Sequence, residues 1–262
     1  MSNLLERGIQ VLELLAGHPE GLALSAIASA GNLPLSATHR LLSDLVRVGY
    51  VRQLRGQGDY VLTIKLVSLG LSFLSASGVV DVAQPSLDAL AEVSRELVRL
   101  AIVDGDELVF VAKAQGATRG LRYDPDMGLS VRLSCSAAGH AWLSTMSDDA
   151  ALARVAKQGL GVPKDHGPRA PTTLSAVMSC VRATRRRGYA MISDMFAPGM
   201  ASLAAPVVFR GNALGAVTIA GPMVRMTEAR MVTLSESLLH TAEEVAALSL
   251  SSTLLHRRIG SR

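Results

Sequence analysis

The stretch that decides the fold is residues 22–50, LALSAIASAGNLPLSATHRLLSDLVRVGY. Its pattern predicts two short helices joined by a tight turn, which is a helix-turn-helix. Pro34 stands where a first helical residue tolerates a missing N–H, and Gly49 stands where the chain must leave the second helix. The first helix is expected to begin with Ser25 as its N-cap and to end near Gly31.

The second helix separates into two faces. A semi-apolar stripe, spaced i, i+3, i+4 and i+7, is expected to face a core and comprises Thr38, Leu41, Leu42 and Leu45. The opposite stripe offers small hydroxyls and guanidiniums from Ser36, Arg40, Ser43 and Arg47. Such a face suits a DNA major groove, where arginine can fork onto a guanine edge and serine can bond a base or a phosphate.

Two strand-like runs, 50–55 and 59–62, flank a glycine-containing loop and predict a hairpin wing. Arg52 and Arg55 near its tip could contact the DNA backbone or a minor groove. The alternative is a helical hairpin with merely solvated charges, because basic and acidic residues nearly balance over residues 1–65. The order of parts favours double-stranded DNA, and the residues predicted to contact it are Ser25, Ser36, Ala37, Thr38, His39, Arg40, Ser43, Arg47, Arg52 and Arg55.

Composition agrees with two domains, because 262 residues exceed the usual size of one compact domain and 49% hydrophobic content can fill two cores. Only 3% of the residues are aromatic, which argues against a stacking platform for single-stranded nucleic acid. The N-terminus lacks a signal-peptide pattern, and the longer uncharged stretches are broken by Gly, Asn, Ser and Pro. We therefore expect a cytoplasmic protein with no membrane partner.

The sequence indicates neither a metal, a cofactor nor an enzyme. Cys135 and Cys180 are far apart, and the six histidines are scattered without a paired ligand spacing. Cys135 and His140 could be considered a nucleophile and a base, but their spacing does not bring them face to face and no orienting group is evident. An enzyme with an appended DNA-binding domain is therefore less favoured than a DNA-binding regulator, whether or not that regulator binds a metabolite.

Residues 65–78 predict a rigid linker helix, whose apolar side chains Leu66, Leu69, Phe73 and Leu74 suit either another subunit or packing within the same chain. Beyond it, helices and strands alternate. Strands are expected at about 100–103, 108–113, 189–193, 202–209 and 213–220, and helices at about 87–97, 136–146, 148–158, 173–187 and 227–250. Grouped strands with helices outside them predict an antiparallel α+β domain.

Nearly the whole chain resembles the IclR family of bacterial transcription regulators. The resemblance rests on an ordered set of segments: RGIQVLELLAGHPEGLALSAIA at 7–28, LPLSATHRLLSDLVRVGYVR at 33–52, YVLTIKLVSLG at 60–70, SAAGHA at 136–141, RGYA at 187–190, AAPV at 204–207 and GAVTIAGP at 215–222. It implies a winged helix-turn-helix at 1–64, a linker helix at 65–78 and a GAF-like domain at 79–256 that binds an effector and mediates oligomerisation. It also implies a homodimer and often a tetramer. A dimer suits DNA, because two recognition helices about 34 Å apart read half-sites one turn apart.

The expected effector is a small organic acid. In the loop at 119–128, Arg119 or Arg122 could pair with a carboxylate, while the Gly128 backbone, Ser136 and the helix start bind its oxygens. The alternative for either arginine is a solvated loop with Arg–Asp pairing. A second alternative concerns the domain, which could bind no metabolite and serve only oligomerisation or protein partners.

The resemblance places the pocket at Gly128, at 192–194 and at Ser202, Thr218 and Ala220. This chain departs from the family at two points: MISDMF at 191–196 replaces a commonly acidic run, and Ala220 stands where serine is frequent. With Met195, Phe196 and Met200 nearby, a hydrophobic or aromatic acid is favoured over a sugar acid. The predicted effector-binding residues are Arg119, Arg122, Tyr123, Met127, Gly128, Ser136, Ile192, Asp194, Ser202, Thr218 and Ala220.

Overall fold

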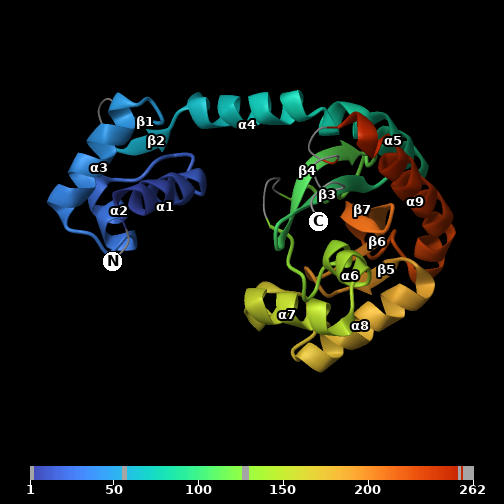
Figure 1. Cartoon of the computed structure of the whole chain (residues 1–262). Helices are drawn as coiled ribbons and strands as arrows, with labels where there is room; N and C mark the ends of the chain where they lie inside the picture. Colours follow the sequence, from blue (N-terminus) through green and yellow to red (C-terminus); the bar gives the residue numbers. More distant parts are fainter. Residues whose placement is uncertain (1–2, 55–57, 126–129, 253–254, 256–262) are drawn as a thin grey trace. The chain divides into compact units, whose positions relative to one another are not determined.

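The computed structural model describes residues 3–54, 58–125, 130–252 and 255 (Figure 1). The chain divides into two compact units, Met1–Leu74 and Ser75–Arg262, which we call unit 1 and unit 2. Arg55, Met127 and Gly128, which the sequence singled out, lie outside the described residues.

Unit 1 is three helices followed by a small hairpin: α1 (Leu4–Ala16), α2 (Leu24–Ala30), α3 (Leu35–Arg47), β1 (Val51–Gln53) and β2 (Tyr60–Leu62). A capping box begins α1, where Asn3 Oδ1 accepts from the Glu6 N–H at 3.0 Å and Glu6 Oε2 accepts from the Asn3 N–H at 2.9 Å. The core joins all these elements and comprises Val11, Leu15, Ile27, Leu41, Leu42, Val51 and Tyr60.

The predicted starts of α2 and α3 differ from the observed ones by one or two residues. Ala23, and not Ser25, is the N-cap of α2, because Leu24 already has helical geometry and packs against the core. Pro34 is the N-cap of α3 and not its first residue. Gly49 leaves the end of α3 with φ +81°, a left-handed conformation that glycine adopts without steric cost. The wing is confirmed, although both of its strands are shorter than predicted.

Helix α4 (Ile64–Ser77) follows the wing where the linker helix was predicted. Of the face named above, Leu69 and Phe73 are 58% and 57% exposed, and Leu66 and Leu74 are half-buried. Within the described ranges no single helix has both the length and the apolar character of a membrane span. Only α4 and the next helix, Val79–Ser94, meet that criterion when taken together, and they are bent at their junction.

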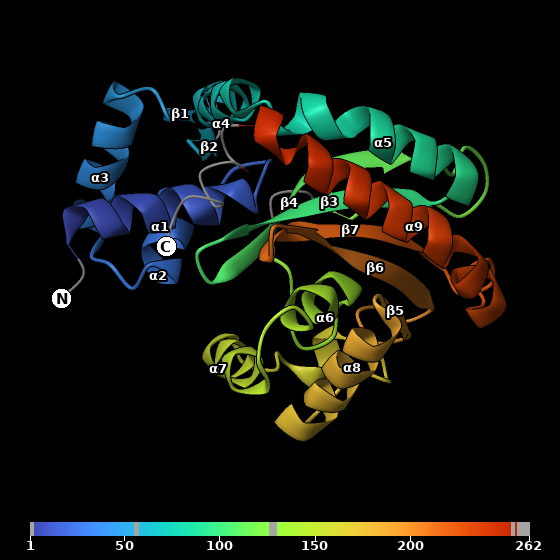
Figure 2. The same ribbon diagram turned by 45° about the vertical axis from the view of Figure 1, so that its right-hand side comes forward.

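Unit 2 is built on five antiparallel strands: β3 (Leu97–Asp104), β4 (Glu107–Gln115), β5 (Ala190–Ser193), β6 (Met200–Phe209) and β7 (Asn212–Pro222). Their order is β4-β3-β7-β6-β5. Helices α5 (Val79–Ser94) and α9 (Glu228–Leu248) cover one face, and α6 (Ala137–Leu143), α7 (Asp148–Gln158) and α8 (Leu174–Arg187) lie on the other side (Figure 2). The predicted α+β class with an antiparallel sheet is confirmed.

The main core of unit 2 lies between the sheet and α6, α7 and α8. Trp142 and Leu143 of α6 meet Leu108 of β4 there, all nearly inaccessible to solvent. His140 is buried beside them, with Nε2 2.9 Å from the Ser134 carbonyl oxygen. Burial lowers the pKa of His140 below its usual 6.5, with the Ser134 hydrogen bond acting against that change.

One boundary matters for the site. The helix predicted at 87–97 ends at Ser94, because Arg95 takes a left-handed conformation with φ 55°, and β3 begins at Leu97 instead of Leu100. Arg99 therefore lies inside the sheet and not in a connection before it.

Candidate functional site

The outward face of α3 is the first candidate site. Of the predicted contact residues, Ser36, His39, Arg40, Ser43 and Arg47 are exposed on it, and Ala37 is half-buried beside them. Leu35, Asp44 and Val46 of α3 are exposed as well. Thr38 is fully buried, and its hydroxyl donates to the Pro34 carbonyl at 3.1 Å. This placement argues against a DNA contact for Thr38, because its side chain belongs to the core stripe.

The exposed side chains of α3 differ in how far they are already engaged. Ser43 donates its hydroxyl proton to the His39 carbonyl at 2.8 Å, which leaves its oxygen as an acceptor. Arg47 is 3.1 Å from Asp44 in a solvent-exposed pair, which contributes little to stability and can exchange for another anion. Arg40 has no ion pair among the residues that the structure describes, so its guanidinium fork is available.

The wing and the end of α3 are fastened together. Thr63 donates to the Gly49 carbonyl at 2.6 Å, and the Lys65 ammonium donates to the Val48 carbonyl at 2.6 Å. Lys65 Nζ also lies 4.8 Å from the centre of the Tyr50 ring. Arg52 of β1 is exposed on the wing. These contacts hold the Arg52 side of the wing in a fixed position relative to α3. Ser25 is exposed on α2.

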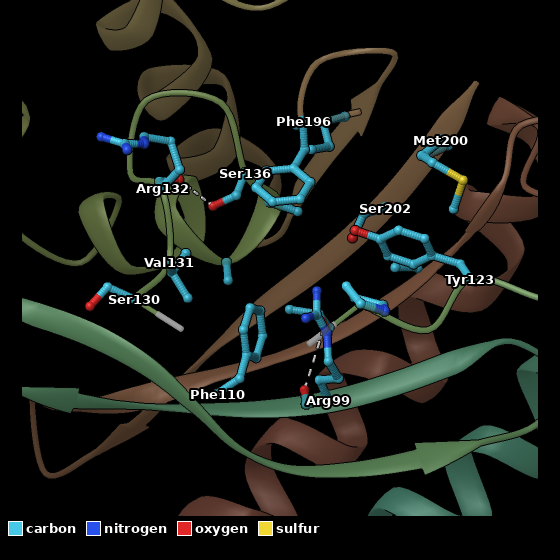
Figure 3. Close-up of a pocket in the computed structure, with 17 residues that line it drawn as sticks. Arg99, Phe110, Tyr123, Ser130, Val131, Arg132, Ser136, Phe196, Met200 and Ser202 are labelled. Atoms are coloured by element: carbon cyan, nitrogen blue, oxygen red, sulfur yellow. Dashed lines mark hydrogen bonds between the residues drawn. The ribbon is translucent and has the colours of Figure 1, made fainter. Parts of the chain in front are cut away.

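The second candidate site is a pocket in unit 2, on the face of the sheet that carries α6 (Figure 3). The antiparallel register places Arg99 of β3 opposite Thr218 of β7, and Ser202 of β6 opposite Ala220 of β7. The cavity is about 110 Å³. Its lining comprises Arg99, Phe110, Tyr123, Pro125, Ser130, Val131, Arg132, Ser136, Ala137, Ala138, Ile192, Phe196, Met200, Ala201, Ser202, Thr218 and Ala220.

Arg99 is the most unusual side chain of the pocket. It is only 7% exposed, and its Cζ lies 3.6 Å from the centre of the Phe110 ring. Its Nε is buried, and no described residue is its hydrogen-bond partner. Burial lowers the pKa of Arg99, with Tyr123 and Asp124 acting against that change, yet a guanidinium stays charged in a protein. The described lining therefore holds a buried positive charge and no carboxylate.

The segment that carries Tyr123 is tied down at three points. Gln115 Nε2 donates to the Tyr123 carbonyl at 3.1 Å, and Lys113 donates to Asp124 at 2.7 Å. Arg225 Nη2 donates to the Leu121 carbonyl at 2.9 Å. These bonds hold the Tyr123 ring toward Ser202, across the cavity from Ser130 (Figure 3). Burial raises the pKa of Tyr123, although Arg99 acts in the opposite direction, and the phenol keeps its proton.

Arg225 is itself held by Glu96, which is only 2% exposed and lies at the start of β3. Arg225 Nε and Nη2 donate to the two carboxylate oxygens at 2.6 and 2.8 Å. Gly221 lies beside this pair, and a Cβ at that position would force the Glu96 carboxylate to shift. The pair links the Tyr123 segment to the sheet.

The structure brings together six of the predicted effector-binding residues, namely Tyr123, Ser136, Ile192, Ser202, Thr218 and Ala220. Phe196 and Met200, expected to make the pocket apolar, also line it, whereas Met195 packs against the core.

Three predicted residues do not line the pocket. Arg119 is exposed, and Arg122 is exposed and pairs with Asp124 at 3.6 Å, which is the solvated alternative that the sequence left open. Asp194 Oδ1 accepts from the Gly199 N–H at 2.7 Å and so closes the loop before β6. These placements are corrections to the predicted site.

Arg99, Phe110 and Arg132 were missed. A signal for Arg99 exists, because it is the lone charge in the apolar run LVRLAIV at 97–103. A charged residue in a strand buried on both faces needs a partner or a ligand.

The structure also places the residues that the sequence analysis considered for metal binding or catalysis. The described residues contain no group of three or more His, Cys, Asp or Glu side chains able to hold a metal ion. Burial raises the pKa of the Cys135 thiol, which disfavours a reactive thiolate. His140 is already engaged with the Ser134 carbonyl.

A winged helix-turn-helix joined in one chain to an α+β sheet domain is the build of a DNA-binding regulator. Two family models match the chain, the IclR helix-turn-helix domain over residues 4–55 and the bacterial transcriptional regulator IclR C-terminal domain over residues 71–247. The chain therefore belongs to the IclR family of DNA-binding transcription regulators.

Similar proteins agree with this assignment. The transcriptional repressor IclR of Escherichia coli K12 is 29% identical over 246 residues, covering 92% of this chain and 88% of that protein. The IclR transcriptional regulator of Alicyclobacillus acidocaldarius has the same fold, with a TM-score of 0.80 at 20% identity over 95% of this chain and 99% of the other. An IclR homologue of Microbacterium hydrocarbonoxydans, complexed with 4-hydroxybenzoate, has a TM-score of 0.78 at 21% identity over 95% and 100% of the two chains.

Proposed function

We propose that this regulator reads an operator through α3 and the wing, and that a small aromatic or hydrophobic acid in the unit 2 pocket controls its DNA binding. The observation that carries the effector part is Arg99, a buried cation in a cavity whose described lining holds no carboxylate. A carboxylate ligand would neutralise that charge and occupy its free donor. Phe110, Tyr123 and Phe196 favour an aromatic acid. The 4-hydroxybenzoate complex of a homologue is consistent with this class.

The proposed DNA surface has two parts. Ser36, His39, Arg40, Ser43 and Arg47 would enter the major groove, with Ala37 close enough to meet a thymine methyl. Ser25 and Arg52 would contact phosphates beside the groove.

We propose a homo-oligomer acting in the cytoplasm, where bacterial operators lie, with no catalytic step. The exposed Leu69 and Phe73 of α4 offer apolar surface for a second copy. Two copies would present two recognition helices to a palindromic site.

The test has two stages. The full-length protein is first used to select duplexes from a random library, and the enriched sequence then serves as operator in anisotropy titrations with and without benzoate, 4-hydroxybenzoate and phenylacetate. We expect a palindromic consensus and a change in operator Kd of about fivefold or more with at least one acid. Absence of an enriched sequence would overturn the DNA-binding proposal. Acids that bind without altering operator affinity would instead support a unit 2 that serves oligomerisation or protein partners.

A further inference from the structure

We infer that Arg99 makes this pocket selective for monocarboxylates of about one ring in size, and that it rejects dicarboxylates. The inference rests on the proposed function, because it specifies which acids the same pocket takes. It follows from four features of the lining: the donors at one end, the acceptors beside them, the apolar opposite wall and the volume.

The donors come from Arg99 and Tyr123. Phe110 stacks against the flat face of the guanidinium, with 3.6 Å from Cζ to the ring centre, so the N–H groups at its edge stay directed outward. Among the residues that the structure describes, none accepts a hydrogen bond from Nε. The neutral Tyr123 phenol lies on the same side and can donate one more hydrogen bond to a carboxylate oxygen.

The hydroxyls beside Arg99 cannot replace it as anion donors. Ser202 donates to the Ile219 carbonyl at 2.9 Å, and Thr218 lies 3.5 Å from the Arg99 carbonyl, to which it donates. The Ser202 hydroxyl therefore presents lone pairs to the cavity, which repel a carboxylate and suit a hydroxyl donor of the ligand. The Thr218 contact is long, so this neutral hydroxyl can turn, but it cannot balance the charge of an anion. The Arg99 guanidinium can therefore neutralise one carboxylate of a ligand.

The opposite wall is mainly apolar, and its Ser136 hydroxyl is already engaged, since it donates to the Arg132 carbonyl and accepts from the Gly139 N–H at 3.0 Å. Ala137, Ala138 and Ile192 supply the apolar surface, with Phe196 across the cavity from Phe110 (Figure 3). Arg132 lines the pocket, but its guanidinium points away from Arg99 in Figure 3 and Nη1 donates to the Gln158 carbonyl at 3.5 Å. A second carboxylate would be buried among these side chains, and no described lining residue would place a cation beside it, which is strongly unfavourable.

The volume restricts the ligand further. The cavity is about 110 Å³, whereas an apolar protein cavity of roughly 150 Å³ holds one benzene molecule. A ligand of one ring, or an aliphatic acid of similar bulk, is the largest that enters with modest adjustment of Phe196 and Met200. Fused rings and nucleotides need more room than this cavity offers.

Calorimetry on the full-length protein at neutral pH tests this selectivity with benzoate, the neutral analogue benzamide and the dicarboxylate terephthalate. We expect benzoate to bind about 10- to 100-fold more tightly than either analogue, which is the range for a charge-assisted hydrogen-bonded pair. Arg99→Met should bring benzoate down to the affinity of benzamide, and unchanged benzamide binding would show that the pocket is intact. Arg99→Lys keeps a cation without the stacked fork and should retain part of the preference.

Arg122→Met is the matched control, because Arg122 is an exposed arginine near the pocket that does not line it. It should keep the wild-type ratio of affinities. The inference is overturned if Arg99→Met still prefers benzoate, if terephthalate binds wild type as tightly as benzoate, or if wild type binds none of benzoate, phenylacetate and cyclohexanecarboxylate.

The same variants separate this inference from the proposed function. An Arg99-dependent preference for benzoate, with no acid affecting operator affinity, would support the selectivity and sink the regulatory role. If an acid changes operator affinity equally in wild type and Arg99→Met, the regulatory role stands and the selectivity assigned to Arg99 is wrong.

Discussion

Arginine has opposite surroundings in the two units. Arg40 of α3 is exposed to solvent, whereas Arg99 of β3 is 7% exposed and stacked on Phe110. An exposed guanidinium keeps its hydration, so it pays no desolvation penalty in the absence of a partner and remains available to a guanine edge or a phosphate. A buried one is stable only if its surroundings or a ligand compensate its charge. The difference teaches that the position of a cation, more than its presence, indicates which kind of partner it takes.

Removal of Arg225 should give the largest effect, because it leaves Glu96 buried and unpaired. We expect Arg225→Met to lower the free energy of unfolding of unit 2 by about 3 kcal/mol, at the low end for a broken buried pair since Arg225 is about one-third exposed. Urea unfolding followed by the fluorescence of Trp142, the single tryptophan, measures this. Arg122→Met is the exposed control and should change stability by about 0.5 kcal/mol or less. A loss below about 1 kcal/mol for Arg225→Met would show that the buried pair does not support the unit.

Removal of Arg40 tests the exposed member of the comparison. Arg40→Ala should cost about 1 to 3 kcal/mol at one operator position and relax the base preference there. Competition titrations with operators substituted at each position measure the effect. Equal weakening on operator and random DNA at fixed salt would show that Arg40 touches only phosphate.

Acid should weaken unit 2 through His140, whose pKa is lowered by burial. The unfolded chain takes up a proton near the ordinary pKa of 6.5 while the buried ring stays neutral, so stability falls as the pH drops below about 6.5. We expect a loss of about 1 kcal/mol between about pH 7 and pH 5.5, followed by Trp142 fluorescence in urea. His140→Gln should be less stable at neutral pH but show a shallower loss in acid. An identical slope in the variant would assign the acid sensitivity to other groups.

The smallest effect is expected on the wing. Arg52→Ala should weaken binding to all sequences alike and reduce the slope of log affinity against log salt by about 0.9, the value for one phosphate contact. Arg186→Ala, an exposed arginine of α8, provides the control and should leave the slope unchanged. The same slope for Arg52→Ala and wild type would place Arg52 away from the DNA.

The sequence predicts unit 1 better than it predicts the pocket. Thr38, Leu41 and Leu42 are buried as their helical spacing indicates, and Arg40 lies outward. These properties depend on one helix, and periodicity reports them directly. Ser25 was misplaced as a cap because Leu24, an apolar residue, extends the helix by packing on the core.

The pocket depends on strands far apart in the chain. Thr218 and Ser202 were found through the family resemblance, but no local pattern brings Arg99 opposite Thr218, 119 residues later. Arg119 and Arg122 were preferred because they precede the helix that starts near Ser136. Both side chains are instead exposed to solvent, where water compensates their charge and no ligand is needed to do so. Register between strands decides such a site, and it is set by the whole sheet.

Operator affinity as a function of benzoate concentration, compared in wild type, Arg99→Met and Arg122→Met, tests most directly whether the buried arginine couples the pocket to DNA. We expect operator Kd to change by about fivefold or more in wild type and Arg122→Met, because an effector must bind two states of the protein unequally to control it. In Arg99→Met we expect no change at the same benzoate concentrations, with operator affinity in the absence of acid kept. An undiminished response in Arg99→Met would contradict this role of Arg99.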